Sequence, residues 1–483
     1  VPLRLEGRRL LLAMADPLDA GLIEDIRFTA GLELDVVSAE LSAIQERIAE
    51  LYGGDGGVDF RELETLVGAA DPFEGIEIVL EADETASLEE LLRSTEEPPA
   101  IRMANAIILE AIRLNASDIH IQPRTKTVVV RLRIDGVLAD KIHIPHQLHQ
   151  SLVSRLKIMA ELDISERRRP QDGRITVKTP LRMVDLRIST LPTINGEKVV
   201  MRLLDRNGAV RSIEQLDLGE ANRERVLDMV DKPQGIILAT GPTGSGKTTT
   251  LYSLLQHDAT PDKNYVTIED PVEYYLDAAG QVLIREKIGL TFPVVLRALL
   301  RQDPDVILVG EIRDLETAEV AFHAALTGHL VYSTLHTNSA IATVARLLDL
   351  GLKPYVVATA MEGIIAQRLV RRICRHCREA AVPDQALQRR LGSGYAGRSG
   401  WIGRGCGHCG GTGYQGRVGI YEVLQFDDEL RDRISGGASM LEVGRLARDR
   451  GLMPMLEDGA GKAERGETSW NELLRVLGPQ AEN

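Results

Sequence analysis

The fold is decided by residues 241–249, which read GPTGSGKTT. An apolar run, residues 236–239, precedes this stretch, and leucines at helical spacing follow it. A buried strand, a glycine-rich turn and a helix are the context of a phosphate-binding loop, whose pattern is glycine, four residues, glycine, lysine and threonine. The residues expected to bind a nucleotide are Gly241, Pro242, Thr243, Gly244, Ser245, Gly246, Lys247, Thr248 and Thr249.

Each residue type in this loop has a physical role. Gly244 and Gly246 let the backbone turn tightly, so that its N–H groups can surround an anion. The helix that starts there points its positive end at the phosphates. Lys247 supplies a point charge for the β- and γ-phosphates, and the Thr248 hydroxyl is a hard oxygen ligand for Mg²⁺. The stretch therefore predicts binding of a nucleoside triphosphate such as ATP.

Polar residues follow three later apolar strands. Residues 266–270 end in Glu269 and Asp270, residues 305–311 end in Glu311, and residues 330–336 end in His336. Open α/β sheets bind ligands at the carboxyl ends of their strands. A carboxylate there can hold a metal's water or activate the attacking water. A lone histidine is often structural, but three polar strand ends after one phosphate loop predict a site.

Residues 98–210 predict an α+β domain with an antiparallel sheet. Helices are expected after Pro98 and over residues 146–162, and strands over residues 117–121, 128–134, 174–178, 183–189 and 198–203. Residues 167–174 predict a basic loop. A triphosphate site often takes an arginine from a neighbouring subunit, which makes the arginines of this domain of interest. The alternative for most of them is an ordinary surface ion pair.

The cysteines form two Cys-x-x-Cys pairs, Cys374 with Cys377 and Cys406 with Cys409, with 28 residues between the pairs. Four thiolates at such spacing predict a closed, tetrahedral Zn²⁺ site. The intervening loop is long, but a loop can lengthen without moving its ends. The alternative, redox disulfides, is disfavoured in a cytoplasmic chain, which would keep the thiols reduced.

Composition limits the class of the protein. A length of 483 residues predicts several domains, and 44% hydrophobic residues are usual for a globular protein. Because the chain has no apolar run of about 18 residues and no charged-then-apolar leader, we expect a cytoplasmic protein. The net charge of −14 disfavours nucleic acid as the main partner, since phosphate binding needs a basic face.

The N-terminal region predicts a small α/β unit followed by an acidic segment. Residues 3–17 read as an extended stretch that turns at Asp16 and Pro17, residues 18–30 and 41–51 as helices, and residues 32–37 as a strand. Residues 71–97 carry ten acidic residues and one basic residue. Such a run is usually extended and solvated, which predicts a linker, although part of it could fold onto a basic partner.

Four motifs resemble the secretion ATPases of the type II secretion and type IV pilus machines: GPTGSGKTTT, VTIEDPVEY, DPDVILVGEIRD and TGHLVYSTLHTN. The segments ASDIHIQP and RPQDGRI resemble the middle domain of the same family, and the cysteine pairs resemble its assembly and secretion types. The resemblance implies a RecA-like ATPase domain of α/β type, preceded by a PAS-like α+β domain, and a hexameric ring that hydrolyses ATP between subunits.

The resemblance also implies residue roles. Glu311 would be the catalytic glutamate, Glu269 would help to hold Mg²⁺ and water, and His336 would sense the γ-phosphate. Arg187 and Arg202 stand where the family supplies arginines to the phosphates. Arg297 is a weaker candidate for the same role.

The domain organisation expected from these signals has six parts. They are a partner-docking α/β domain (1–60), an acidic linker (61–97), the middle α+β domain (98–210), the ATPase domain (211–370), the zinc insert (371–420) and a helical C-terminal region (421–483). By resemblance, the N-terminal domain would dock on a bitopic inner-membrane protein and the ring would act on an inner-membrane platform protein, which would attach a cytoplasmic ring peripherally to that membrane.

The function expected is ATP hydrolysis that powers pseudopilus assembly and export by a type II secretion system. A type IV pilus extension ATPase is the main alternative, and the short region before Pro98 favours secretion over it. A ring ATPase that translocates nucleic acid is disfavoured by the acidic balance. A nucleotide-gated scaffold with little turnover is disfavoured by the position of Glu311.

Overall fold

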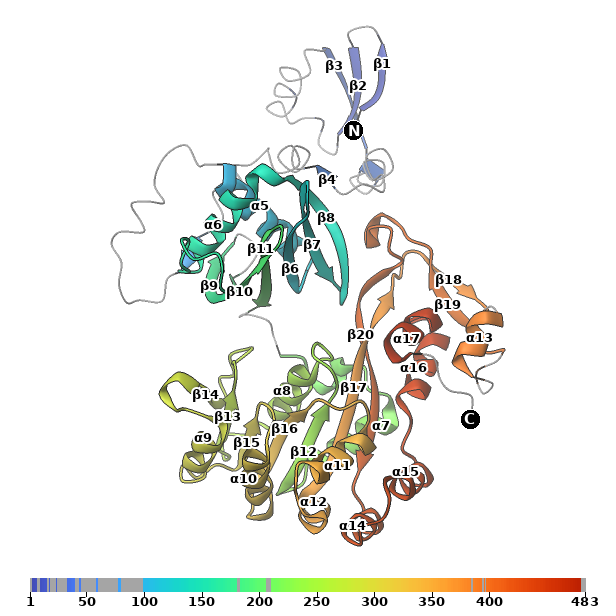
Figure 1. The fold of residues 1–483 in the computed structure, drawn as a ribbon. Coiled ribbons are helices and arrows are strands. Elements are labelled where there is room, and N and C mark those ends of the chain that lie inside the picture. The colour runs from blue at the N-terminus through green and yellow to red at the C-terminus, as the bar shows by residue number, and fades with distance from the viewer. Residues whose placement is uncertain are drawn as a thin grey trace.

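The computed structural model describes residues 99–179, 183–205, 210–383, 385–392, 395 and 397–478. In the N-terminal part it describes residues 2–6, 9–14, 17, 23, 33–39, 43–44, 58–59 and 77–79. The helices expected over residues 18–30 and 41–51 fall almost wholly outside these ranges, as does most of the acidic segment. Figure 1 shows a small N-terminal sheet, a middle domain and an ATPase domain following one another.

The N-terminal sheet has three strands, β1 (Pro2–Glu6), β2 (Arg9–Met14) and β3 (Glu33–Ser38). The expected extended stretch is in fact an antiparallel pair, β1 with β2, and β3 lies parallel to β2. Two short strands come next in the chain, β4 (Val58–Asp59) and β5 (Glu77–Val79). Strand β5 pairs with the middle sheet, so residues 77–79 are not the free linker that the acidic composition predicted.

The middle domain is a sheet with two helices, as expected, but the sheet has eight strands where five were predicted, and it is antiparallel apart from the parallel pairing of the edge strand β4. Its helices are α5 (Pro99–Arg113) and α6 (His149–Met159), the second preceded by a 3-10 turn, η1 (His146–Leu148). Its strands are β6 (Asp118–Pro123), β7 (Thr127–Ile134), β8 (Val137–Pro145), β9 (Gln171–Lys178), β10 (Met183–Thr193) and β11 (Gly196–Asp205). The strand order is β4-β8-β7-β6-β11-β10-β9-β5.

Strand β8 was not predicted, and β9 begins earlier than expected. The turn at Asp135 and Gly136 has positive φ at both residues, which joins β7 to β8 as a tight hairpin. Residues 171–173, predicted to belong to a basic loop, pair with β10 instead. The sheet buries one face against α5 and α6, where Met103, Ile107 and Leu152 are fully buried.

The ATPase domain is built on a seven-stranded sheet with the order β14-β13-β15-β16-β12-β17-β20. All neighbours are parallel except β17 and β20, which are antiparallel. The strands are β12 (Gly235–Thr240), β13 (Tyr265–Glu269), β14 (Ala279–Leu283), β15 (Val306–Val309), β16 (Leu330–Leu335), β17 (Met361–Ile373) and β20 (Tyr414–Gln425). Strands β12, β15 and β16 are buried at every residue, because helices cover both faces of a parallel sheet.

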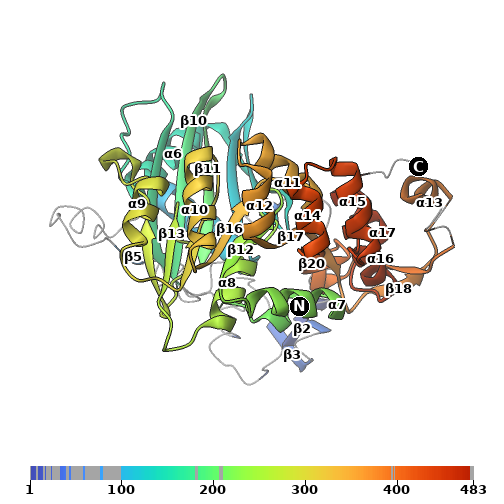
Figure 2. The same cartoon turned by 90° about the horizontal axis from the view of Figure 1, so that it is seen from below.

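The helices that cover this sheet differ in how they begin. They are α7 (Glu220–Val230), α8 (Lys247–Asp258), α9 (Phe292–Leu299), α10 (Leu315–Leu326), α11 (Ala340–Asp349) and α12 (Pro354–Ala360), with 3-10 turns η2 (Ile213–Leu216) and η3 (Glu286–Ile288). Asp314 and Ser339 cap α10 and α11 through their side chains. Figure 2 shows the sheet edge-on between these helices.

Residues 421–483 were predicted to be helical, but this region begins in a strand, because β20 runs to Gln425 in the central sheet. Between β17 and β20 lie β18 (Arg378–Ala381), α13 (Gln385–Leu391), β19 (Gly400–Gly403) and a 3-10 turn, η5 (Gly407–Cys409). After β20 come α14 (Asp428–Ser435), α15 (Met440–Asp449), α16 (Met455–Glu464) and α17 (Trp470–Leu477). Within the described residues, no helix is both long and apolar enough to cross a bilayer.

Strands β17 and β20 continue beyond the sheet as a two-stranded ribbon, which carries the cysteines at its tip (Figure 1). Arg371 on this ribbon pairs with Glu472 of α17 at 2.9 Å, and this carboxylate is fully buried. The β7–β8 hairpin of the middle domain contacts the same ribbon, because Gly416 N–H donates to Asp135 Oδ2 at 2.8 Å. The ribbon therefore touches both the middle domain and the C-terminal helices.

Candidate functional site

The phosphate loop joins the buried strand β12 to helix α8. Gly246 caps α8 in the left-handed region at φ 91°, and Gly244 stands at φ 78°, conformations that other residues adopt only with strain. The first turn of α8 has no acidic residue, so no negative side chain of that turn offsets the positive end of the helix dipole, which faces the loop. The loop thus has the shape and the polarity that hold an anion.

Lys247 lies inside the loop rather than in solvent. Its Nζ donates to the carbonyl oxygens of Gly241 at 2.8 Å and of Pro242 at 3.2 Å. Burial lowers the pKa of Lys247 to about 8, although the nearby Glu311 carboxylate acts to raise it. The amine therefore lies in the loop, where negatively charged phosphate oxygens would stabilise its protonated form.

Glu311 stands just past the end of β15 and is brought to the same edge of the sheet. The chain around it is fixed to β16, since Ile312 N–H donates to Thr334 O at 3.0 Å and Thr334 Oγ1 donates to Gly310 O at 2.7 Å. Its carboxylate pairs with Arg313, and His336 Nε2 lies 3.5 Å from its other oxygen. The structure thus brings Lys247, Glu311 and His336 together, although they follow three different strands, β12, β15 and β16.

Glu269 lies at the end of β13 but is turned away into the protein. Its side chain is buried, and its carboxylate accepts hydrogen bonds from Tyr252, from Thr267 Oγ1 at 2.6 Å and from Gln281 Nε2 at 3.2 Å. Burial raises the pKa of Glu269, while these three donors act to lower it. Both carboxylate oxygens of Glu269 are therefore engaged by neighbouring side chains of the ATPase domain.

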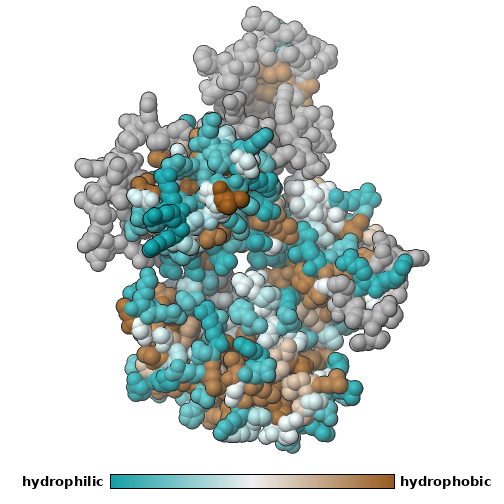
Figure 3. Space-filling view, in the orientation of Figure 1, coloured by the Kyte–Doolittle hydropathy of each residue, from teal (hydrophilic) through white to brown (hydrophobic). Residues whose placement is uncertain are grey.

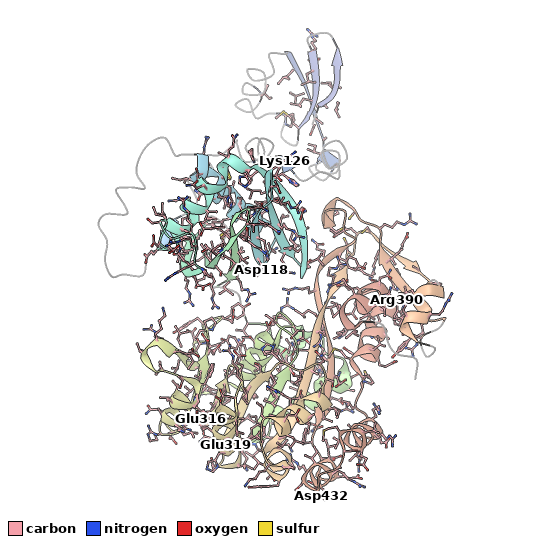
Figure 4. The ribbon with its side chains drawn as sticks, in the orientation of Figure 1. Asp118, Lys126, Glu316, Glu319, Arg390 and Asp432 are labelled. Atoms are coloured by element: carbon pink, nitrogen blue, oxygen red, sulfur yellow. The ribbon has the colours of Figure 1, made fainter. Side chains whose placement is uncertain are left out.

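The middle domain contributes a row of three arginines. In the register of β9, β10 and β11, Arg187 stands opposite Arg202 on one side and opposite Arg174 on the other. Within the part of the chain that the structure describes, the buried Nε of Arg187 finds no hydrogen-bond partner. Arg202 Nε pairs with Asp118 at 3.1 Å, on the side of the middle domain that faces the ATPase domain (Figure 4).

This arginine row faces the loop that follows β13. Burial raises the pKa of Glu273, and Arg187, Arg202 and Arg174 oppose that rise. Conversely, burial lowers the pKa of Arg187, and Glu273 opposes that fall. Sequence reasoning missed Arg174 and Glu273 as site residues. Arg174 shares a face of the sheet with Arg187 because the two are directly paired across β9 and β10. Hydrophilic side chains border the hollow between the two domains in Figure 3.

Arg297, the weaker candidate, lies elsewhere. It is on α9, where its guanidinium pairs with Glu316 of α10 at 2.8 Å. Both side chains are at least half exposed, so the pair is an ordinary surface ion pair of small energy.

The four cysteines meet at the tip of the ribbon. Their sulfur atoms lie within 4.8 Å of one another, and the separations are 3.8 Å between Cys374 and Cys406 and 3.9 Å between Cys377 and Cys409. Four sulfurs held about 2.3 Å from a central zinc stand roughly 3.8 Å apart, so the spacing fits a tetrahedral site. His376 and His408 stack on each other at 3.9 Å beside the cysteines and are not in the cluster.

Backbone N–H groups support the thiolate form at this cluster. Cys409 Sγ accepts from the N–H groups of Cys406 and Gly413, each at 3.2 Å. Burial opposes a charge on Cys409, but these two donors, together with hydrogen bonds from the thiols of Cys406 and Cys377, lower its pKa to about 7. Such N–H···S bonds are what a metal-bound thiolate needs from its surroundings.

Two protein families match the chain. The family described as "Type II/IV secretion system protein" matches residues 93–475, and the MshEN domain matches residues 1–58. The type II secretion system protein E of Pseudomonas aeruginosa is 45% identical over 95% of this chain and 90% of its own length. The type IV pilus assembly ATPase PilB of Thermus thermophilus is 44% identical over 98% of this chain and 52% of its own length.

Solved structures share the fold. The pilus retraction motor PilT with bound ADP has 26% sequence identity and a TM-score of 0.52, covering 79% of this chain and 97% of its own. The ATPase DotB of Legionella pneumophila has 23% identity and a TM-score of 0.58, covering 78% of this chain and 96% of its own. At 23% identity, the likeness to DotB concerns the fold alone.

Proposed function

The chain belongs to the family of type II/IV secretion system proteins, and from this premise we propose that it hydrolyses ATP to power pseudopilus assembly and protein export by a type II secretion system. The observation that carries the ATPase part is the meeting of Lys247, Glu311 and His336 beside a phosphate loop. Membership of a secretion ATPase family supports the coupling to transport.

The proposed chemistry divides among these residues. The loop and Lys247 bind the β- and γ-phosphates, and Thr248 at the start of α8 would offer its hydroxyl to Mg²⁺. When bound, Mg²⁺ neutralises charge on the phosphates. Glu311 accepts a proton from the water whose oxygen bonds to the γ-phosphorus as the bond to ADP breaks. His336, beside Glu311, senses whether the γ-phosphate is present.

The present contacts leave room for two of the expected roles. The Glu269 carboxylate accepts hydrogen bonds from Tyr252, Thr267 and Gln281, and its two oxygens can accept about four, so it can hold a metal-bound water without losing them. The pair with Asp118 uses the Nε of Arg202, which is one of the five N–H donors of the guanidinium, so contact with a phosphate does not require that this pair break. The Nε of Arg187 is buried and has no hydrogen-bond partner within the described structure.

We further propose that the four cysteines hold one Zn²⁺ per chain as a structural site. The four sulfurs fill a tetrahedral shell, which leaves no position for a substrate. Zinc would thus fix the tip of the β17–β20 ribbon rather than take part in catalysis.

The partners of the protein and its location are further proposals. The ring would be a homo-hexamer attached to the cytoplasmic side of the inner membrane through a bitopic secretion protein, which would bind the N-terminal domain. It would act on an inner-membrane platform protein. The match of residues 1–58 to the MshEN domain supports a separate role for that region.

A second candidate function is extension of a type IV pilus. The pilus assembly ATPase PilB of Thermus thermophilus covers almost the whole chain at an identity close to that of the secretion proteins. Complementation separates the two: the gene should restore secretion in a strain that lacks its secretion ATPase and should not restore piliation.

The experiment that tests the ATPase proposal compares two variants. Lys247→Ala should lose nucleotide binding, because it removes the charge that the phosphates need. Glu311→Gln should bind ATP as before but turn it over on the order of 10²-fold or more slowly. Binding is measured by calorimetry and turnover by phosphate release. Hydrolysis by Glu311→Gln at the wild-type rate would show that Glu311 is not the catalytic residue.

A further inference from the structure

Gln367 on β17 lies under the phosphate loop. Its side chain is 1% exposed, and its Nε2 donates to the carbonyl oxygen of Ser245 at 2.8 Å. In the described structure, Gln367 Oε1 and Ser245 Oγ are buried and have no hydrogen-bond partner. Burial of such an amide costs free energy of folding, so its one hydrogen bond is expected to serve a purpose that an apolar side chain could not.

The hydrogen bond fixes the direction of one peptide plane. The peptide that joins Ser245 to Gly246 is trans, so its C=O and N–H point in opposite directions. Because the C=O points at Gln367, the N–H of Gly246 points to the other side, into the loop. Gly246 is the cap of α8, so this N–H is one of the donors that a phosphate would meet.

Gln367 also limits the loop at both of its ends. A Cβ on Gly241 would stand 2.5 Å from the backbone oxygen of Gln367, and a Cβ on Gly246 would stand 3.1 Å from its Nε2. The loop therefore packs directly on this one residue. Strand β17 is held beside β12 by its parallel pairing, which ends at Thr240 and Ala366, immediately before the contact.

The next residue connects the same place to the loop of His336. Arg368 donates from Nη1 to Gln367 O at 3.1 Å and from Nη2 to Asn338 Oδ1 at 2.8 Å. Asn338 is two residues from His336. The dipeptide of Gln367 and Arg368 thus ties the phosphate loop to the proposed phosphate-sensing loop.

We propose that Gln367 is a positioning residue, which orients the Ser245–Gly246 peptide so that its N–H binds the β-phosphate of the nucleotide. This inference rests on the proposed ATPase function and adds a residue from outside the phosphate loop to that site. The β-phosphate is common to ATP and ADP and is bound both before and during hydrolysis. Losing its donor therefore weakens binding of both nucleotides and leaves the chemical step nearly unchanged.

The test replaces Gln367 with an unbranched side chain of similar length and no hydrogen-bond donor. Gln367→Met should raise KM for ATP and Kd for ADP by a similar factor, roughly tenfold or more, with kcat within about twofold of wild type. Gln367→Glu should raise both constants further, because a carboxylate faces the Ser245 oxygen and repels the phosphates. The matched control is Val370→Ala, a fully buried change on the same strand, which should lower Tm and leave KM and Kd unchanged.

The outcomes separate this inference from the proposed function. If Lys247→Ala abolishes ADP binding while folded Gln367→Met and Gln367→Glu keep wild-type KM and Kd, the positioning role is wrong and the ATPase proposal stands. If Val370→Ala raises KM as much as Gln367→Met does, the effect is general loosening of β17 and the inference fails. If Lys247→Ala binds ADP as wild type does, the proposed nucleotide site itself is wrong.

Discussion

Burial controls the charge of the most important single residue, Lys247. Its amine is enclosed by the loop carbonyls, and burial lowers its pKa to about 8 from an ordinary value of 10.5. In the nucleotide-free protein the amine therefore loses its proton as the pH rises through about 8. Bound phosphates favour the charged form and raise this pKa, so binding above pH 8 requires the uptake of a proton.

This linkage predicts a pH-dependent affinity. The association constant for ADP should be steady near pH 7 and should fall above pH 8, approaching tenfold per pH unit where the free amine is neutral and the bound amine is charged. Calorimetry between pH 7 and pH 9.5 measures it, and proton uptake appears as a dependence of the heat on the buffer. Lys247→Arg is the control, because a guanidinium stays charged and should flatten the profile. A constant wild-type affinity over this range would contradict the prediction.

At the scale of elements, the β17–β20 ribbon connects sites that lie far apart in sequence. The middle of β17 supports the phosphate loop through Gln367, and its C-terminal end leads directly into Cys374. Near that tip, Arg371 binds the buried Glu472 of α17, and Gly416 binds Asp135 of the middle domain. If the tip of the ribbon becomes less ordered, we therefore expect the C-terminal helices to loosen before the central sheet does.

Zinc removal tests this expectation. Protein purified without chelator should contain one Zn²⁺ per chain, and metal binding in small zinc domains contributes roughly 10 kcal/mol or more to folding. Chelation should speed hydrogen exchange first in residues 374–414, while the fully buried strands β12 and β16 stay protected. Cys409→Ser should reproduce this loosening without chelator. Elemental analysis that finds no zinc would refute the metal assignment.

At the scale of the whole molecule, the arginines of the middle domain lie at its border with the ATPase domain. Within one chain, Arg187 faces Glu273 of the ATPase domain and Arg202 pairs with Asp118. In the proposed ring, the same face would be offered to the triphosphate of a neighbouring subunit, which is the role that the family resemblance implies for Arg187 and Arg202. Activity should then rise steeply with protein concentration, because the isolated chain lacks part of its site.

Mixing two inactive variants tests this division of labour. Arg202→Ala supplies an intact Glu311, and Glu311→Gln supplies an intact Arg202, so some interfaces of a mixed ring have both. ATPase activity that is absent from each variant alone should then return in part. The control is the double variant, which carries both substitutions. Mixed with either single variant it should stay inactive, because one of the two residues is then missing from every chain. No recovery in rings confirmed to be mixed would mean that both residues serve the site of their own subunit.

The N-terminal domain gives a second prediction at this scale. The two large sheets have separate buried cores within residues 99–478, and the matched MshEN region lies outside them. Deletion of residues 1–97 should therefore leave folding and basal ATPase activity largely intact, although it also removes the short strands β4 and β5 from the edges of the middle sheet. Membrane recruitment and secretion should be lost. Fractionation of cells that contain the partner proteins measures recruitment, and co-sedimentation of the truncated chain with inner membranes would place the docking site elsewhere.

The sequence by itself determined the local chemistry of this protein. The phosphate loop and the two cysteine pairs are recognisable because all the residues of each motif are close in the chain and their spacing is set by short backbone geometry. The parallel strands that end in Glu311 and His336 could be predicted for the same reason, since a buried strand is a short apolar run. The RecA-like fold and the family followed from these motifs together.

Only the tertiary structure decided which of these groups meet and which way their side chains point. Glu269 and Glu311 both follow apolar strands, yet Glu269 turns inward to Tyr252, while Glu311 joins His336. No local pattern marks Gln367 or Arg174, because each acquires its neighbours through strand pairing across the sheet. Pairing register and the face of a strand depend on contacts between distant segments, which a linear pattern does not encode.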